Sequence, residues 1–114
     1  MKKNKIKFIV CCMFILLLCG CGSNEIDYKK LMSENEYVII DVRTKEEYNS
    51  SHLVGAINIP YDQIDESINL DKENIILVYC MSGMRSNKAF FALKNLGYEV
   101  YDLGAFSEID LPKQ

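Results

Sequence analysis

The sequence predicts an α/β domain of three layers, in which a central parallel sheet carries helices on both faces. Strand-like and helix-like segments alternate at short intervals from residue 27 onward. The strand-like segments are mainly continuous apolar runs, as in strands that are buried on both faces. A length of 114 residues, with 49% hydrophobic and 25% charged residues, fits one globular domain.

The first helix and the first strand are expected close to residue 27. Asp27 is placed to N-cap a short helix. Residues 37–42 (YVIIDV) are a continuous run rich in β-branched side chains, which predicts a buried strand. Thr44 and Glu47 then have the capping-box spacing, so we expect a short helix to begin there and assign both residues to capping alone.

The rest of the chain continues the alternation of strands and helices. Three further strands are expected, over residues 56–59, 74–79 and 100–103. Pro60 should end the first of them, and Asp62 is placed to cap a helical turn that contains Ile64 and Ile68. Residues 86–96 have apolar side chains at helical spacing, and Gly97 is the expected stop.

The N-terminus is typical of a bacterial lipoprotein signal. Four lysines precede the uncharged apolar run of residues 8–18, which is shorter than the roughly 20 residues that span a bilayer. The sequence that follows, Leu18-Cys19-Gly20-Cys21, resembles a lipobox, in which a cysteine after a small residue is acylated and becomes the new N-terminus. We expect Cys21 to be this cysteine; an uncleaved apolar anchor is the alternative.

These features divide the chain into three expected parts: a signal peptide over residues 1–20, the lipidated cysteine with a short tether over residues 21–26, and the folded domain over residues 27–114. The protein would then be lipid-anchored on the extracytoplasmic face of the cell membrane. Loss of residues 1–20 removes four of the 13 basic residues and none of the 16 acidic ones, so the net charge changes from −3 to −7. We do not expect an acidic domain without a basic stripe to bind nucleic acid.

Cys80 is the best candidate for a reactive group. It is the only cysteine after residue 21, which excludes a disulfide within the folded part, and His52 is the only histidine, so a zinc site is not expected either. Cys80 follows the most apolar strand, where open α/β sheets bind their ligands. The residues after it pass through a glycine turn into a helix: Met81, Ser82, Gly83, Met84, Arg85 and Ser86. We expect loop amides, the helix N-terminus and the Arg85 guanidinium to favour the thiolate.

Two blocks of sequence resemble single-domain rhodanese-like proteins, which are sulfurtransferases. One block comprises residues 41–48 (DVRTKEEY) and 52–60 (HLVGAINIP), and the other comprises residues 79–86 (YCMSGMRS). The resemblance implies a rhodanese-like three-layer fold and a thiosulfate or persulfide sulfurtransferase activity. It implies that Cys80 carries a sulfane sulfur as a persulfide and that residues 81–86 bind the substrate. The implied partners are a small sulfur donor and a thiol or cyanide acceptor, with no cofactor or metal ion.

Several other polar and aromatic residues have structural interpretations. We expect His52 to be a hydrogen-bonded structural residue rather than an acid or base. Asp41 and Arg43 should form a salt-bridged or hydrogen-bonded pair that shapes the site. Phe90 and Phe91 are expected to lie in the core.

Three alternative functions stay open. A related phosphatase or arsenate reductase would place five residues between its cysteine and arginine, whereas four separate Cys80 from Arg85. A non-catalytic binding module would need no cysteine at this position. A thiol redox relay at the cell surface would take its resolving thiol from a partner, because no second cysteine follows residue 21.

Overall fold

The computed structural model describes residues 26–114, so the predicted signal peptide and Cys21 lie outside the described residues. Its four strands are β1 (Tyr37–Asp41), β2 (Ile57–Asn58), β3 (Ile75–Cys80) and β4 (Val100–Ala105). Its helices are α2 (Tyr28–Glu34), α3 (Lys45–Ser50) and α4 (Met84–Asn95), with short 3-10 helices η1 (Tyr61–Gln63) and η2 (Phe106–Glu108). The strands form one parallel sheet in the order β2, β1, β3, β4.

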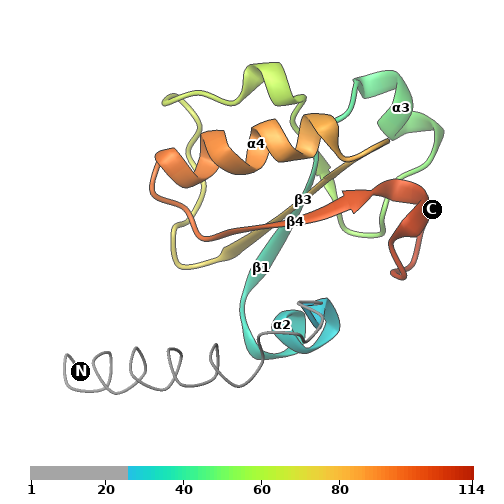
Figure 1. Cartoon of the computed structure of the whole chain (residues 1–114), viewed down its shortest axis with the longest axis horizontal. Coiled ribbons are helices and arrows are strands. Elements are labelled where there is room, and N and C mark those ends of the chain that lie inside the picture. The colour runs from blue at the N-terminus through green and yellow to red at the C-terminus, as the bar shows by residue number, and fades with distance from the viewer. Residues whose placement is uncertain (1–25) are drawn as a thin grey trace, which may run out of the picture.

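The sheet separates two apolar layers, because successive residues of the fully buried strand β3 point to opposite faces. Ile76, Val78 and Cys80 pack on the side of α4. Their neighbours Ile75, Leu77 and Tyr79 pack on the other side, against side chains of α2, α3 and the C-terminal segment. Figure 1 shows α4 above the sheet and α2 below it. The predicted three-layer fold with a central parallel sheet is therefore confirmed.

The two predicted helix caps are also confirmed. The Asp27 carboxylate accepts a hydrogen bond of 3.1 Å from the Lys30 amide at the start of α2. At the start of α3, the Thr44 hydroxyl accepts from the Glu47 amide and the Glu47 carboxylate accepts from the Thr44 amide, which completes a capping box. These caps explain why both short helices begin where the sequence indicates.

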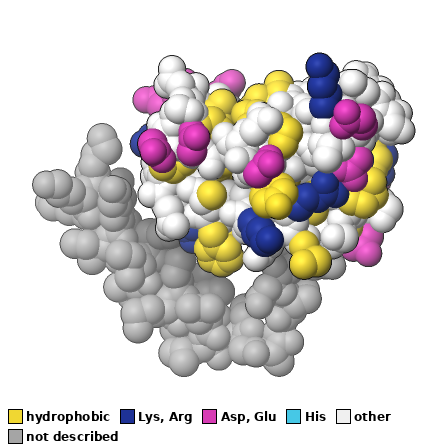
Figure 2. All heavy atoms as spheres, turned by 90° about the horizontal axis from the view of Figure 1, so that it is seen from above, with side chains coloured by type: hydrophobic (Ala, Val, Ile, Leu, Met, Phe, Trp, Pro, Cys, Tyr) yellow, Lys and Arg dark blue, Asp and Glu magenta, His cyan; other side chains and the backbone are white. Residues whose placement is uncertain are grey.

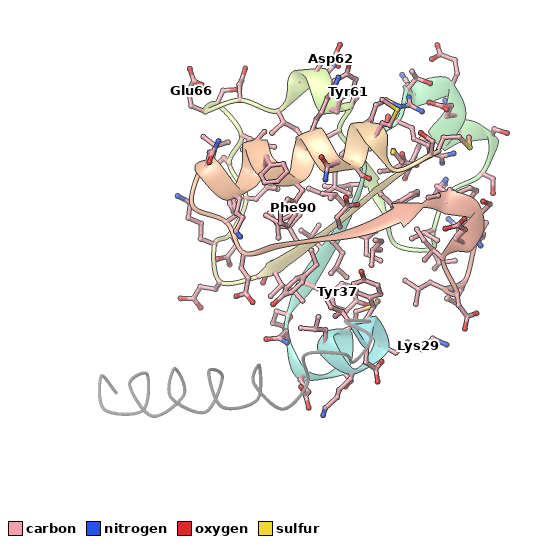
Figure 3. All side chains as sticks on the ribbon, in the orientation of Figure 1. Lys29, Tyr37, Tyr61, Asp62, Glu66 and Phe90 are labelled. Carbon is pink, nitrogen blue, oxygen red and sulfur yellow. The ribbon has the colours of Figure 1, made fainter. Side chains whose placement is uncertain are left out.

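The helical turn after β2 begins earlier than predicted and is not capped by Asp62. Pro60 precedes η1 with φ −53° and makes no side-chain capping bond, and Asp62 lies inside the turn. Proline fixes φ near this value and so starts the turn without a capping side chain. Figure 3 shows Tyr61 and Asp62 side by side in this segment above α4. Ile64 and Ile68 lie beyond η1, where they pack on the α4 side of the core.

Helix α4 begins at Met84, two residues before the predicted start. Gly83 occupies the N-cap position with φ +100°, a left-handed conformation that lets the chain turn into the helix at once.

The expectation that Phe90 and Phe91 are both core residues is correct for Phe90 and wrong for Phe91. Phe90 packs against the core, but Phe91 is 55% exposed, since adjacent helix positions point in different directions.

Two features of the described part bear on partners. Within residues 26–114, no helix combines the length and the apolar character needed to cross a bilayer. Figure 2 views the molecule from above, on the side of α4, and shows acidic and basic side chains interspersed. On that face, the described residues form no continuous basic stripe of the kind that follows a nucleic-acid backbone.

Candidate active site

Cys80 is the last residue of β3 and lies at the carboxyl end of the parallel sheet. It is 0% exposed and belongs to the apolar layer beneath α4. Its backbone pairs with Ala105 of β4, so the neighbouring strand fixes its position. The sequence therefore places a rigidly held thiol where parallel α/β sheets present their functional groups.

The chain turns back over the sulfur directly after Cys80. Gly83 adopts φ +100° and its amide N–H donates to the Cys80 Sγ over 3.0 Å. The Ser86 Oγ, in the first turn of α4, lies 3.4 Å from the same sulfur and 3.2 Å from the Gly83 carbonyl oxygen. A single sulfur atom is thus enclosed by the loop and by the N-terminus of α4.

This enclosure sets the ionisation of the thiol. Burial raises the pKa of Cys80, but the hydrogen bond with the Ser86 side chain and those from the amides of Ser86, Gly83 and Ser82 outweigh it, and the net pKa is lowered. The N-terminus of α4 adds its positive end at the same place. A thiolate is a far better nucleophile than a thiol, so the loop prepares Cys80 to act as a nucleophile.

Arg85 is directed toward Glu47 and makes no hydrogen bond with Cys80. Its guanidinium donates to both oxygens of the Glu47 carboxylate, over 2.7 and 3.1 Å. Hydrogen bonds to Glu47 are the main reason that the pKa of Arg85 is raised, and the charge of Cys80 adds a smaller part. Arg85 acts on the sulfur at a distance, while the short contacts come from Gly83 and Ser86.

Glu47 therefore does more than cap α3, and its assignment to capping alone is wrong. Hydrogen bonds from Arg85, with weaker ones from Thr44, outweigh burial and lower the pKa of Glu47 to about 2. The carboxylate stays charged throughout the neutral and mildly acidic range. It joins α3 to the first turn of α4, a contact that spacing in the sequence could not reveal because the partners are 38 residues apart.

The predicted Asp41 and Arg43 pair is present and buried. The Arg43 guanidinium donates to Asp41 over 2.6 to 3.0 Å and to the Ser51 carbonyl oxygen over 2.6 Å. The hydroxyl of Tyr79, the residue before Cys80, donates to the same Asp41 carboxylate over 2.8 Å and accepts from the Leu53 amide over 3.0 Å. Burial raises the pKa of Tyr79 well above its ordinary value, so this hydroxyl remains a donor. This network joins the end of β1 and the segment after α3 to β3, directly beside Cys80.

His52 has the hydrogen-bonded structural placement that was predicted. Its ring stacks on Tyr48 with 3.9 Å between ring centroids, and its Nδ1 lies 2.8 Å from the Tyr48 carbonyl oxygen. Its Nε2 lies 3.2 Å from the side-chain nitrogen of Gln114, and the backbones of the two residues exchange two bonds of 2.8 Å. His52 thus fastens the C-terminal segment to α3.

A cleft of about 350 Å³ opens beside the Cys80 loop. Its lining residues are Arg43, Glu46, Glu47, Ser50, Ser51, Met81 and Phe106. Met81 is 44% exposed here, and the nearby Met84 is 71% exposed. The six predicted substrate-binding residues therefore divide into two groups. Gly83, Ser86 and the backbone amide of Ser82 contact the sulfur. Met81 and Met84 are exposed, and Arg85 is directed toward α3.

The comparison with protein families gives a match over most of the chain. The profile of the Rhodanese-like domain family matches residues 26–109. The chain is similar to "Thiosulfate sulfurtransferase PspE" of Escherichia coli (strain K12), with 40% identity over an alignment of 78 residues that covers 65% of this chain and 75% of that protein. It is also similar to "Thiosulfate sulfurtransferase GlpE" of Coxiella burnetii. The identity is 34% over 76 aligned residues, which cover 65% of this chain and 71% of the Coxiella protein.

Solved structures agree with this match. A structure described as "rhodanese with anions from E. coli" superposes with a TM-score of 0.63 and 36% sequence identity, covering 68% of this chain and 96% of the other. A rhodanese-like domain from Anabaena gives a TM-score of 0.61 at 28% identity and covers 81% of this chain and 98% of the other. By the extent of the family match, this chain belongs to the Rhodanese-like domain family.

Proposed function

We propose that the protein is a sulfurtransferase that moves a sulfane sulfur from a donor such as thiosulfate, through a Cys80 persulfide, to a thiol or cyanide acceptor. The observation that carries this proposal is the enclosure of the Cys80 sulfur by the Gly83 amide and the Ser86 hydroxyl. The likeness to relatives named as thiosulfate sulfurtransferases supports it. The Cys80 persulfide is the intermediate that both half-reactions share.

In the first half-reaction, the Cys80 thiolate attacks the outer sulfur of the donor. With thiosulfate, the new bond joins Cys80 Sγ to that sulfur, the sulfur–sulfur bond of thiosulfate breaks, and sulfite leaves with the bonding electrons. The persulfide keeps one negative charge, so charge is conserved. In the second half-reaction, an acceptor thiolate or cyanide attacks the outer sulfur of the persulfide, and Cys80 leaves as a thiolate.

The residues around Cys80 support both half-reactions by stabilising negative charge on sulfur. The Gly83 amide, the Ser86 hydroxyl and the N-terminus of α4 favour the thiolate before attack and again when it leaves. The loop must also move, because Cys80 has no exposed surface in this conformation. Met81 and Gly83 belong to a short segment between β3 and α4, and a shift of this segment would expose the sulfur.

We also propose that Cys21 carries the lipid that anchors the protein to the extracytoplasmic face of the cell membrane. This proposal is supported by the sequence, in which a basic segment and a short apolar run precede Gly20 and Cys21. The described domain would then work at the membrane surface, with small sulfur compounds and thiols as its partners.

The experiment that tests the enzymatic proposal is a sulfur-release assay on the full chain in detergent. Thiosulfate is supplied as the donor with cyanide as the acceptor, and thiocyanate is measured; a small organic persulfide serves as a second donor. Turnover should require Cys80, so the Cys80→Ser variant should be inactive. Turnover of an aryl phosphate without sulfur transfer would favour a phosphatase. Absence of both activities would favour a binding module or a redox relay.

A further inference from the structure

The size of the sulfur site determines where the rest of a donor must lie. The loop around Cys80 encloses one sulfur, with Gly83 and Ser86 in direct contact and no exposed surface left on the cysteine. A donor that presents its outer sulfur to Cys80 has to keep its leaving group outside this enclosure. The cleft beside the loop is the adjoining space, because it is lined by Met81, the residue after Cys80, and by Glu47, which binds Arg85.

Both guanidinium groups at this end of the molecule are already neutralised by carboxylates. Arg43 lines the cleft, but its guanidinium forms a buried pair with Asp41 at 2.6 Å. Arg85 is held by both oxygens of Glu47. Each positive charge is already offset by a carboxylate, so a second anion would gain little net attraction unless an existing pair breaks, and breaking the buried pair is costly.

The remaining charge at the cleft is negative. Glu46 lines the cleft, is exposed and makes no ion pair within residues 26–114. Lys113 lies nearby, 5.2 Å from the centroid of the Phe106 ring, but it does not line the cleft and its ammonium donates to the Ile109 carbonyl oxygen. Together with Met81 and Phe106, the cleft thus offers apolar surface and an unpaired carboxylate.

We infer that, if the proposed sulfur transfer is correct, the preferred donor is an organic persulfide on an uncharged or apolar carrier rather than the thiosulfate dianion or a persulfide on an acidic carrier. The leaving group of thiosulfate is the dianion sulfite, which would meet Glu46 without an unpaired cation to offset the cost of leaving water. An uncharged carrier avoids this repulsion and gains contact with Met81 and Phe106.

The transfer is balanced without any further reactant. The Cys80 thiolate attacks the outer sulfur of the persulfide R–S–SH, and a bond forms between the two sulfurs. The sulfur–sulfur bond of the donor breaks, and the carrier leaves as the thiolate R–S⁻. Cys80 becomes the persulfide Cys80–S–SH, so the single negative charge passes from Cys80 to the carrier and the proton stays on the outer sulfur.

Three donors test the inference on the full chain in detergent: N-acetylcysteamine persulfide, N-acetylcysteine persulfide and thiosulfate. The first two present the same reacting group and differ mainly by one carboxylate. The rate of sulfur addition is measured by mass on the peptide that carries Cys80, so that the cysteines before residue 22 do not contribute. The uncharged donor should load Cys80 fastest, and added salt should speed loading by thiosulfate because it screens the repulsion.

The charge of Glu46 is tested by Glu46→Gln, with Glu66→Gln as the matched control. Glu66 is also exposed and lies toward the other end of α4, away from its start at Met84 (Figure 3). Glu46→Gln should raise the rate with thiosulfate and with the acidic persulfide by about twofold to fivefold, the range for removal of one nearby like charge. It should leave the rate with the uncharged persulfide nearly unchanged, and Glu66→Gln should change none of the three rates.

The outcomes separate this inference from the function on which it rests. If no donor adds sulfur to Cys80, the proposed sulfur transfer itself is wrong. If all three donors load Cys80 but thiosulfate is fastest, or if Glu46→Gln leaves every rate unchanged, the sulfur transfer stands and the inferred donor class is overturned.

Discussion

Glu47 binds Arg85 through two hydrogen bonds, of 2.7 and 3.1 Å, and so joins α3 to the first turn of α4. The same carboxylate completes the capping box with Thr44 at the start of α3. One side chain therefore supports both the helix that borders the cleft and the loop that encloses Cys80. Through this contact, the geometry around the Cys80 sulfur depends on Glu47, a residue 38 positions before Arg85 in the sequence.

Replacing Glu47 tests the energetic importance of this contact. Glu47→Gln keeps a side chain that can complete the capping box but removes the charge that binds Arg85, so we expect a loss of about 1 kcal/mol of unfolding free energy at pH 7. Because the pKa of Glu47 is lowered to about 2 in the folded protein, this stabilisation is present above about pH 5. It is lost as the pH falls toward 2. Urea unfolding of the wild-type protein and of Glu47→Gln, at pH 7 and near pH 2, measures the difference in unfolding free energy between them. This difference should be smaller at the lower pH. The neighbouring Glu46→Gln should show no such pattern, and an equal difference at both pH values would contradict the account.

Gly83 is tested against a second glycine with the same backbone requirement. Gly83 and Gly55 both have positive φ, +100° and +86°, and an added Cβ would meet nothing within 4 Å at either position. Gly83→Ala and Gly55→Ala should each cost about 1 kcal/mol of unfolding free energy, from backbone strain alone. Gly83→Ala alone should also raise the pKa of Cys80, because the amide moves away from the sulfur. The rate of alkylation of Cys80 against pH measures this, and equal curves for the two variants would contradict the assigned contact.

The source of the lowered Cys80 pKa is tested by Ser86→Ala and Arg85→Ala. The Ser86 hydroxyl lies 3.4 Å from the sulfur, whereas Arg85 is bound to Glu47. Ser86→Ala should therefore raise the alkylation midpoint more than Arg85→Ala does. In the wild-type protein, the midpoint of the alkylation curve of Cys80 should lie at a lower pH than that of an ordinary cysteine, because the pKa of Cys80 is lowered. A larger shift for Arg85→Ala would show that the guanidinium, and not the loop, sets the pKa.

Lipidation of Cys21 predicts a processed protein that is held in the membrane. The mature chain should lack residues 1–20, partition into detergent and carry acyl chains on Cys21, because two chains give stable anchoring. Cys21→Ala should accumulate as the unprocessed precursor, whereas Cys19→Ala should be processed normally. Intact mass distinguishes the forms; an unmodified Cys21 or a retained Met1 in the wild-type protein would contradict the proposal.

Much of the fold could be predicted from the sequence because its signals are local. The apolar run of β3 and the caps at Asp27 and Thr44 depend on residues within one turn or one strand. The same holds for Cys80, which lies at the C-terminal end of the most apolar strand. The start of α4 was misplaced because Gly83 itself serves as the N-cap, in a left-handed conformation that apolar spacing does not reveal. The helical turn after β2 was misplaced because Pro60 begins it without a capping side chain.

The parts of the site that could not be predicted depend on contacts between distant segments. Glu47 had a sufficient local explanation as a cap, so its bond to Arg85 emerged only from the folded structure. Tyr79 looked like one more apolar residue of β3, yet its hydroxyl binds the buried Asp41 carboxylate. In both cases a side chain has one role in its own helix or strand and a second role in contact with a residue distant in the sequence. A sequence pattern shows only the first role.

The most direct test of sulfur transfer is the mass of the Cys80 peptide after the full chain has been incubated with a sulfur donor. The account predicts a gain of about 32 Da, one sulfur atom, which disappears when cyanide or a small thiol is added. Cys80→Ser should show no gain while its unfolding curve stays close to that of the wild-type protein, because serine is similar in size but is not ionised near neutral pH. A Cys80 peptide that gains no sulfur from thiosulfate or from either persulfide would contradict the account.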